Sequence, residues 1–304
     1  MRFEGIIPAF VSPLSDDNIT INENAVCKLI AYLLLIGADG FYICGNTGEG
    51  IVMQKNERKK LCEIVIDAVR GRKPVITHIG AVDLKTSIDL ALHAERAGSN
   101  AIASVPPFYY KYDDIDIVNF YRELDKAVNI PIMVYYHPAA NLNMQAELIY
   151  EIFKLEHVTA VKWSSSNYYE MLRLKDMTNG EINIINGPDE TLICGLAAGA
   201  DGGIGSTYNL MTAEYKKLYQ YFRDGEIDKA RQMQCKVNRV TSVLIKHNVI
   251  PSIKTVLKSL GFDVGDATYP MPKIEGNDKE LLMEDLKKAG WFDDFEMASL
   301  LGQA

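Results

Sequence analysis

A lysine stands near the end of a short apolar run that has the composition of a buried strand. The run is Val158-Thr159-Ala160-Val161-Lys162-Trp163, and two small hydroxyl residues follow it. A lysine is rarely placed where a buried strand opens into a site. Burial there would lower the pKa of Lys162 and leave a neutral amine able to attack a carbonyl carbon. We therefore predict that Lys162 forms a Schiff base. The alternative is a strand-end lysine whose stem packs while its ammonium group reaches water.

Other stretches that could do chemistry also follow predicted strands. The loop Gly45-Asn46-Thr47-Gly48-Glu49-Gly50 offers backbone N–H groups, an amide and a hydroxyl, which together suit a carboxylate. The alternative is a turn that is rich in glycine for backbone reasons. Tyr135 ends another strand and could transfer protons near Lys162, although a tyrosine there is more often a core residue with its hydroxyl at the rim.

Two further loops carry polar residues. Asn186-Gly187-Pro188-Asp189-Glu190 places two carboxylates at a helix start, where they could hydrogen-bond a polyhydroxylated ligand or simply favour the helix dipole and cap. Gly205-Ser206-Thr207-Tyr208-Asn209 is rich in hydroxyl groups. No pair of histidines has metal-ligand spacing, and full Walker or Rossmann fingerprints are absent, so we predict neither a metal nor an external cofactor.

Strand-like and helix-like stretches alternate eight times, which predicts an α/β fold of the closed (β/α)8, or TIM, barrel type. In such barrels the chemistry lies at the C-terminal ends of the strands. The runner-up, an open doubly wound sheet, would need a glycine-rich phosphate loop after the first strand, and Val11-Ser12-Pro13-Leu14 is not one. The predicted strands are residues 5–10, 39–44, 74–79, 100–105, 131–136, 158–163, 182–186 and 201–205.

The sequence also suggests how the chain is divided. A Gly-x-(Asp/Asn) step that closes a helix precedes several strands, as in Gly37-Ala38-Asp39 and Gly98-Ser99-Asn100. No linker-like stretch interrupts residues 1–304, which predicts a single domain. Residues 1–210 would form the barrel. Residues 211–304 would add its last helix and further C-terminal helices, whose apolar faces could serve an oligomer contact.

Composition bounds the partners. The 304 residues are 48% hydrophobic and carry a formal net charge of −8, which argues against nucleic acid or an anionic membrane as the main partner. No apolar run reaches membrane-spanning length, and we expect no signal peptide. The five cysteines are odd in number and form no CxxC pair, so we expect reduced, buried thiols in a cytoplasmic protein.

Several of these motifs, taken together, resemble the family of N-acetylneuraminate lyase and dihydrodipicolinate synthase. The resemblance covers essentially the whole chain, with the motifs in the same order and at the same strand ends. It is carried by Gly45-Asn46-Thr47-Gly48-Glu49, Val134-Tyr135, Val161-Lys162 and the run from Gly199 to Asn209. Phe108-Tyr109-Tyr110, the Asn186–Glu190 loop and Gly205–Asn209 are similar to the lyase branch in particular.

The resemblance implies a class I aldolase that reversibly cleaves N-acetylneuraminate to pyruvate and N-acetylmannosamine, with no external cofactor. Lys162 would form the imine with the 2-oxo group, and Tyr135 would shuttle the proton. Tyr109 would reach the tyrosine relay of a neighbouring subunit in a homotetramer. The substrate-binding residues implied in the same way are Asn46, Thr47 and the Gly48 N–H for the carboxylate, Ser164 for the carbon-4 hydroxyl, and Gly187, Asp189, Glu190, Gly205 and Ser206 for the sugar tail.

The chain departs from the family pattern at the substrate mouth. Asn46 stands where the family has Ser or Thr, His137 replaces an aliphatic residue, and Ser164 replaces the Thr of the lyases. The loop Ala140-Asn141-Leu142-Asn143 also differs from the lyase pattern, which leaves the exact substrate open. The arginine with which the synthase branch binds its second substrate is missing after Tyr135.

Two alternatives to the lyase therefore remain. The first is an aldolase of the same family that acts on another 2-oxo acid, either a 2-keto-3-deoxy sugar acid or an aromatic aldol, with dihydrodipicolinate synthase disfavoured. The second is a catalytically silent barrel that binds a 2-oxo acid or sialic acid. A binding protein needs neither Lys162 nor Tyr135, so the presence of both argues against it.

Overall fold

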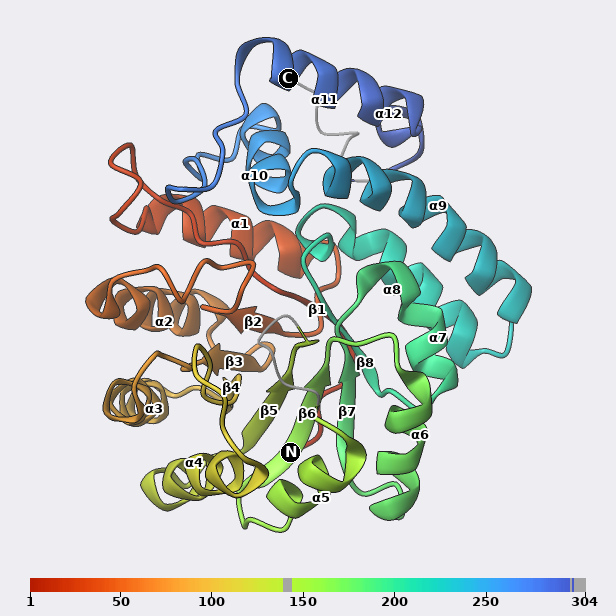
Figure 1. The fold of residues 1–304 in the computed structure, drawn as a ribbon. Coiled ribbons are helices and arrows are strands. Elements are labelled where there is room, and N and C mark those ends of the chain that lie inside the picture. The colour runs from red at the N-terminus through yellow and green to blue at the C-terminus, as the bar shows by residue number, and fades with distance from the viewer. Residues whose placement is uncertain (139–143, 296, 298–304) are drawn as a thin grey trace.

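Eight parallel strands form one sheet that curls into a barrel (Figure 1). The computed structural model describes residues 1–138, 144–295 and 297. Consecutive strands pair in chain order, and β8 pairs with β1. A bridge between Ala9 and Tyr42 joins β1 to β2 and closes the ring. The strands are β1 (Gly5–Pro8), β2 (Phe41–Ile43), β3 (Val75–His78), β4 (Ala101–Ser104), β5 (Ile132–Tyr136), β6 (Val158–Trp163), β7 (Asn183–Asn186) and β8 (Gly202–Gly205).

Helices alternate with the strands and surround them, and the last helices gather beside α8 (Figure 1). The predicted TIM barrel with additional C-terminal helices is confirmed. The last barrel helix, α8, begins at Tyr208, slightly before the boundary predicted at residue 210. The helices are α1 (Glu23–Leu35), α2 (Lys55–Val69), α3 (Leu84–Ala97), α4 (Asp114–Ala127), α5 (Ala146–Phe153), α6 (Tyr168–Met177), the 3-10 turn η2 (Asp189–Thr191), α7 (Leu192–Ala197), α8 (Tyr208–Arg223), α9 (Ile227–Lys246), α10 (Val249–Ser259), α11 (Gly276–Lys288) and α12 (Trp291–Asp294).

Local sequence sets where several helices begin and end. The side chain of Asp83 accepts a hydrogen bond from the backbone N–H of Thr86 at 2.8 Å and so caps the start of α3. Gly37, Gly98 and Gly199 all have φ between 93° and 99°, a left-handed conformation that costs glycine little. The predicted glycine step between helix and strand is therefore present before β2, β4 and β8.

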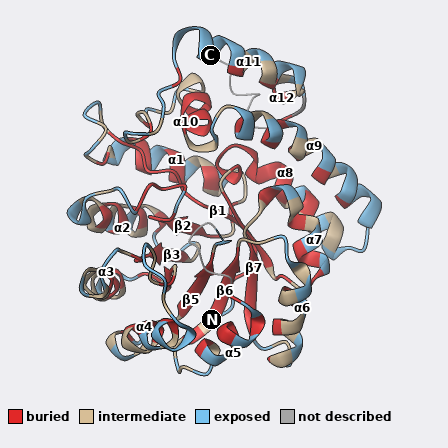
Figure 2. Cartoon of the chain, in the orientation of Figure 1, coloured by how far each residue is buried: buried red, intermediate tan, exposed pale blue. Residues whose placement is uncertain are grey.

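The strands are buried along their length (Figure 2), and their alternating side chains divide the core into two layers. In β1, Ile6 packs outward in the large cluster between strands and helices, whereas Ile7 belongs to a smaller cluster inside the barrel. The inner cluster also holds Tyr42 of β2 and Tyr135 of β5. Residues at alternate positions of different strands are thereby brought face to face inside the barrel.

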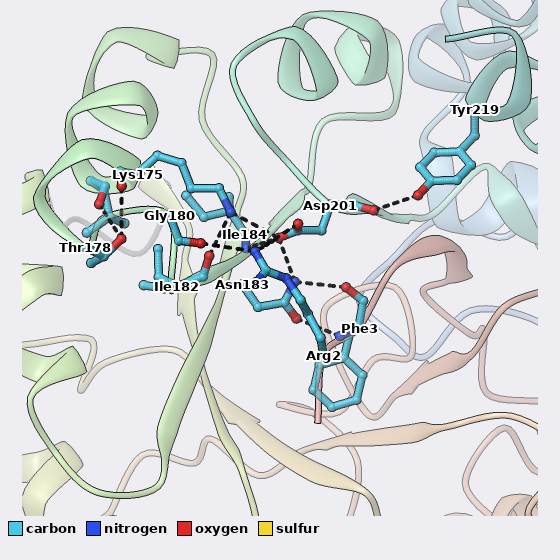
Figure 3. A network of polar contacts seen from close by, with 11 residues as sticks. Arg2, Phe3, Lys175, Thr178, Gly180, Ile182, Asn183, Ile184, Asp201 and Tyr219 are labelled. Atoms are coloured by element: carbon cyan, nitrogen blue, oxygen red, sulfur yellow. Dashed lines mark hydrogen bonds and ion pairs between the residues drawn. The ribbon is translucent and has the colours of Figure 1, made fainter. Parts of the chain in front are cut away.

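A network of polar contacts ties the N-terminal ends of β7 and β8 to the segment before β1 (Figure 3). Asn183 accepts a hydrogen bond from the Phe3 N–H at 2.7 Å and donates to the Phe3 carbonyl at 2.9 Å. It also donates to the Asp201 carboxylate at 2.8 Å, which in turn pairs with Lys175 and Arg2. This network lies at the end of the barrel opposite to the ends of the strands where chemistry is expected.

The structure corrects the expectation that all five cysteines are buried. Cys44 and Cys62 are buried, but the other three thiols are exposed because they lie on the outer faces of helices: Cys27, Cys194 and Cys235. All five are free. Within the described part of the chain, none of the helices is long and apolar enough to cross a membrane. The divergent loop Ala140–Asn143 lies outside the described residues.

Replacing Asn183 with alanine should lower the free energy of unfolding by ~3 kcal/mol, because the N–H and C=O of Phe3 and the Asp201 carboxylate each lose a buried partner. Chemical denaturation monitored by circular dichroism measures this change. The matched control is Asn24→Ala on the exposed side of α1, which should change the free energy by less than about 0.5 kcal/mol. An equal effect of the two substitutions would contradict the stabilising role of the network.

Candidate active site

Lys162 lies inside the barrel near its C-terminal rim. It is the fifth of the six residues of β6, and the parallel register sets it beside Tyr135 of β5 and Ile185 of β7. Only 5% of its surface is exposed. Its Nζ lies 4.2 Å from the centre of the Tyr135 ring and 4.4 Å from the centre of the Tyr42 ring. The strand therefore delivers the amine into a space walled by two aromatic rings.

This position changes the acidity of the amine. Burial lowers the pKa of Lys162 from 10.5 to about 7, because water no longer solvates the ammonium form. The nearby carboxylate of Asp189 works in the opposite direction and offsets part of the shift. At neutral pH a substantial share of the molecules therefore carries an unprotonated, nucleophilic amine at this position. Only 5% of the residue is exposed, so its ammonium group does not reach water as that of a snorkelling lysine would.

Tyr135 is the second predicted catalytic residue, and it is 4% exposed. Burial raises the pKa of its phenol well above the usual value, while a side-chain hydrogen bond with Ser164 partly opposes the shift. The free protein therefore holds Tyr135 protonated at neutral pH. Such a hydroxyl can give its proton to a reacting oxygen as negative charge develops on that oxygen, and the phenolate that is formed can take up a proton in a later step.

The amine opens into a pocket of about 230 Å³ at the C-terminal end of the barrel. Its lining comes from the C-terminal ends of strands and from the loops that follow them, at β2, β5, β6, β7 and β8, which explains why residues far apart in the sequence meet there. Among its lining residues are most of those predicted to act: Asn46, Thr47, Tyr135, Lys162, Ser164, Gly187, Glu190 and Ser206. His137, Pro188 and Ile204 complete the wall.

The loop predicted to bind a carboxylate is held by contacts to neighbouring strands. The hydroxyl groups of Thr47 and Ser206 lie 2.6 Å apart and join the loops after β2 and β8. The Ser12 hydroxyl donates to the Gly48 carbonyl at 2.6 Å. A Cβ on Gly48 would lie only 2.9 Å from the Phe10 carbonyl oxygen, so a larger residue would push the loop away. The backbone around Gly48 is thus fixed close to the pocket.

Some predicted residues lie behind the pocket wall and are not part of its lining. One carboxylate oxygen of Asp189 accepts a hydrogen bond from the Thr207 N–H at 2.7 Å, and burial raises the pKa of this carboxyl to about 6. A Cβ on Gly205 would lie 2.1 Å from the other Asp189 oxygen, so only glycine fits there. The substrate contacts that the sequence predicts for Asp189, Gly205 and Gly48 stay predictions.

Tyr109 is placed away from Lys162 within one chain. It is 81% exposed, has a φ of 83° and packs only its edge against the Tyr110 ring, with 5.0 Å between ring centres. A large aromatic residue held outward in this way does not line the pocket of its own subunit. Its predicted role in a neighbouring subunit remains a prediction.

Two aromatic residues beneath the pocket escaped the sequence reasoning. The Tyr42 ring packs edge-on against Tyr135, with 6.0 Å between ring centres, and the His78 ring packs at 5.8 Å from Tyr135. His78 is held by the Cys44 carbonyl, 3.1 Å from Nδ1, and burial lowers its pKa well below 6.5. Tyr42 is the middle residue of β2 and belongs to the inner cluster, and His78 ends β3. Strand alternation could have identified them once the inward face was known.

The described residues contain no cluster of three or more His, Cys, Asp or Glu side chains that could hold a metal ion. The groups that line the pocket include an amine, a phenol, three hydroxyls, a side-chain amide, an imidazole and a carboxylate. These groups suit covalent capture of a carbonyl carbon beside a bound carboxylate.

Comparison with known proteins identifies relatives of this chain. The model of the dihydrodipicolinate synthetase family matches residues 2–289. The N-acetylneuraminate lyase of Rhizobium meliloti is 33% identical over 284 residues, which are 93% of this chain and 94% of the relative. The CdNal protein from Clostridium difficile, solved in complex with mannosamine, superposes with a TM-score of 0.91 at 26% identity and covers 95% of this chain and all of its own. The Proteus mirabilis N-acetylneuraminate lyase superposes with a TM-score of 0.90 at 27% identity, over 95% of this chain and 99% of its own.

Reductive methylation with formaldehyde and cyanoborohydride should label Lys162 with a half-maximal rate near pH 7, because the reaction requires the neutral amine. Site-resolved mass spectrometry across pH 5–11 measures the rate at each lysine. The surface residue Lys229 is the internal control, since its ion pair with Glu226 at 2.7 Å raises its pKa above 10.5. A midpoint for Lys162 as high as that of Lys229 would show that burial does not depress its pKa.

Proposed function

This chain belongs to the dihydrodipicolinate synthetase family of pyruvate-dependent lyases and synthases, and we propose that its reaction is the reversible cleavage of N-acetylneuraminate to pyruvate and N-acetylmannosamine. The observation that carries the proposal is the buried amine of Lys162, whose pKa is lowered to about 7 and which adjoins the Tyr135 ring in an open pocket. Similarity to several N-acetylneuraminate lyases at 33–34% identity supports this choice of substrate.

In the proposed mechanism the neutral Lys162 amine attacks the 2-oxo carbon of the open-chain sugar acid. Tyr135 gives a proton to the oxygen, and loss of water leaves an iminium ion on Nζ. The Tyr135 phenolate takes the proton from the carbon-4 hydroxyl, and the bond between carbons 3 and 4 breaks as its electron pair moves to the iminium nitrogen. Carbon 4 leaves as the aldehyde of N-acetylmannosamine. The resulting enamine takes up a proton at carbon 3, and hydrolysis releases pyruvate from Lys162.

The pocket offers a place for each end of the substrate. Asn46, Thr47 and the Gly48 N–H would bind the carboxylate next to the imine. Ser164, which shares a hydrogen bond with Tyr135, would lie near the carbon-4 hydroxyl. The sugar tail would be held by Gly187, Glu190 and Ser206 in the lining of the pocket, with Asp189 and Gly205 directly behind them.

We also propose that the active form is a homotetramer in which Tyr109 completes a neighbour's site. The outward position of this side chain, 81% exposed beside Tyr110, supports the proposal, because two adjacent exposed aromatic rings are costly unless another surface covers them. Each pocket would then depend on a tyrosine from another subunit as well as on its own Tyr135.

A second substrate class is kept open by His137. This imidazole lines the pocket, where its ring lies 5.6 Å from that of Tyr135, and burial lowers its pKa below 6.5. A largely neutral, polar ring in place of an aliphatic side chain changes which groups can bind next to the imine. Another 2-oxo acid of the same size, such as a 2-keto-3-deoxy sugar acid, would use the same Lys162 chemistry.

The purified protein should release pyruvate from N-acetylneuraminate, and borohydride should trap a pyruvate adduct on Lys162. Lys162→Ala should abolish both, because no other amine lines the pocket within the described residues, while the circular dichroism spectrum stays unchanged. A coupled lactate dehydrogenase assay follows pyruvate, with 2-keto-3-deoxygluconate tested in parallel.

The outcomes of that experiment separate the candidates. An adduct with added pyruvate but no cleavage of N-acetylneuraminate would move the substrate to another 2-oxo acid. Affinity for either compound without any adduct or cleavage would indicate the silent binding barrel.

Thr47→Val should raise KM for N-acetylneuraminate about ten- to a hundredfold, because a hydrogen bond to a charged carboxylate contributes about 1.5–3 kcal/mol. The expected effect falls on binding of the carboxylate and much less on kcat. The substitution also removes the contact between Thr47 and Ser206. Thr47→Ser is the matched control, since it keeps the hydroxyl and should stay within about threefold of the wild type. Steady-state kinetics decide, and an unchanged KM in the valine variant would place the carboxylate elsewhere.

A further inference from the structure

Tyr42 forms the floor beneath the reactive amine, although it does not line the pocket. The residue lies at the centre of β2, points into the barrel and is fully buried. The Lys162 Nζ lies 4.4 Å from the centre of its ring, nearly the same distance as from the Tyr135 ring. The amine is therefore held between the faces of two aromatic rings, which carry negative charge density.

The hydroxyl group of Tyr42 contributes little to this arrangement. Its oxygen is buried and has no hydrogen-bond partner among the described residues, unlike the Tyr135 phenol, which is linked to Ser164. Burial also raises the pKa of Tyr42 well above 10, so the group stays protonated. Its ring face, in contrast, contacts the reacting nitrogen directly.

The charged groups around the Lys162 Nζ compensate its positive charge only in part, which leaves a role for the Tyr42 ring. Asp189 from η2 faces Lys162, but one of its oxygens already accepts a hydrogen bond from Thr207 and its pKa is raised to about 6. His78 from β3 and His137 after β5 also face Lys162, and burial keeps both largely neutral at pH 7. Compensation for a positive charge on Nζ therefore comes partly from Asp189 and partly from the two ring faces.

We propose that Tyr42 is a further catalytic residue, whose ring face stabilises the positively charged iminium on Lys162 by a cation–π interaction. The proposal rests on the proposed Schiff-base function, since it concerns the intermediate of that reaction. The neutral carbinolamine that precedes the iminium carries no such charge, so the ring favours loss of water from that intermediate. The hydroxyl of Tyr42 has no part in the step.

The sharpest test changes the electron density of the ring and leaves its shape almost unaltered. Tyr42→Phe and the same position carrying mono-, di- and trifluorinated phenylalanine form a graded series, because each fluorine weakens the negative face of the ring. The equilibrium for imine formation is measured with pyruvate alone, by borohydride trapping at Lys162 over a range of pyruvate concentrations. Tyr42→Leu removes the ring altogether.

We expect Tyr42→Phe to trap pyruvate within about twofold of the wild type and to unfold at the same or a higher temperature, because it discards a buried hydroxyl without a partner. The fluorinated series should weaken pyruvate trapping in steps, to about tenfold with three fluorines. Tyr42→Leu should weaken it about ten- to thirtyfold. The pH at which Lys162 is half methylated should also fall, because the ammonium loses the same stabilisation.

Three results would overturn the proposal. Flat trapping across the fluorinated series would show that the ring acts only by packing. An equal loss in Tyr42→Phe and Tyr42→Leu would assign the effect to the hydroxyl. If pyruvate trapping weakened in proportion to the fall in unfolding temperature across all variants, the effect would come from lost stability and not from the ring face. A wild-type protein that trapped no pyruvate would instead refute the proposed function, before any variant was compared.

Discussion

The chemistry of this protein depends on one constraint, which is the burial of the Lys162 amine inside a closed barrel. Water that would solvate the ammonium form is excluded, so the pKa of the amine is about 7. The register of β5 and β6 then fixes Tyr135 at its side, and the bridge from Ala9 to Tyr42 brings β2 around to supply a second ring. The barrel therefore sets both the reactivity of the nitrogen and its neighbours.

The strands carry the residues proposed for catalysis, and the loops carry most of the residues proposed to bind the substrate. The reactive lysine and its two aromatic neighbours all lie on strands and point into the barrel: Lys162, Tyr135 and Tyr42. A shift of one residue in any of these strands would turn the side chain to the opposite face. The groups proposed to read the substrate come from loops joined by single contacts, such as the one between Thr47 and Ser206. A change of substrate within the same fold therefore requires only loop changes, and the Schiff-base chemistry is left intact.

The sequence was sufficient for the order of the elements, since all eight predicted strands are present and Asp83 caps a helix as expected. Lys162 could be recognised because a charged residue in an apolar strand conflicts with its surroundings. Tyr42 could not, because a tyrosine in a strand causes no such conflict and its inward direction depends on barrel closure. The exposure of Cys27 was missed for a related reason: Val26, Leu29 and Ile30 near it in the chain are apolar, but the helix turns the thiol outward.

The same burial that activates the amine makes it costly, because a lysine that is protonated when unfolded loses part of its proton on folding at neutral pH. Folding energy must therefore be supplied elsewhere. At the opposite end of the barrel, Asn183 and Asp201 join three segments through fully paired polar contacts. Function and stability are thus separated along the barrel axis. The costly buried amine lies at the C-terminal ends of the strands, and the paired polar contacts lie at their N-terminal ends.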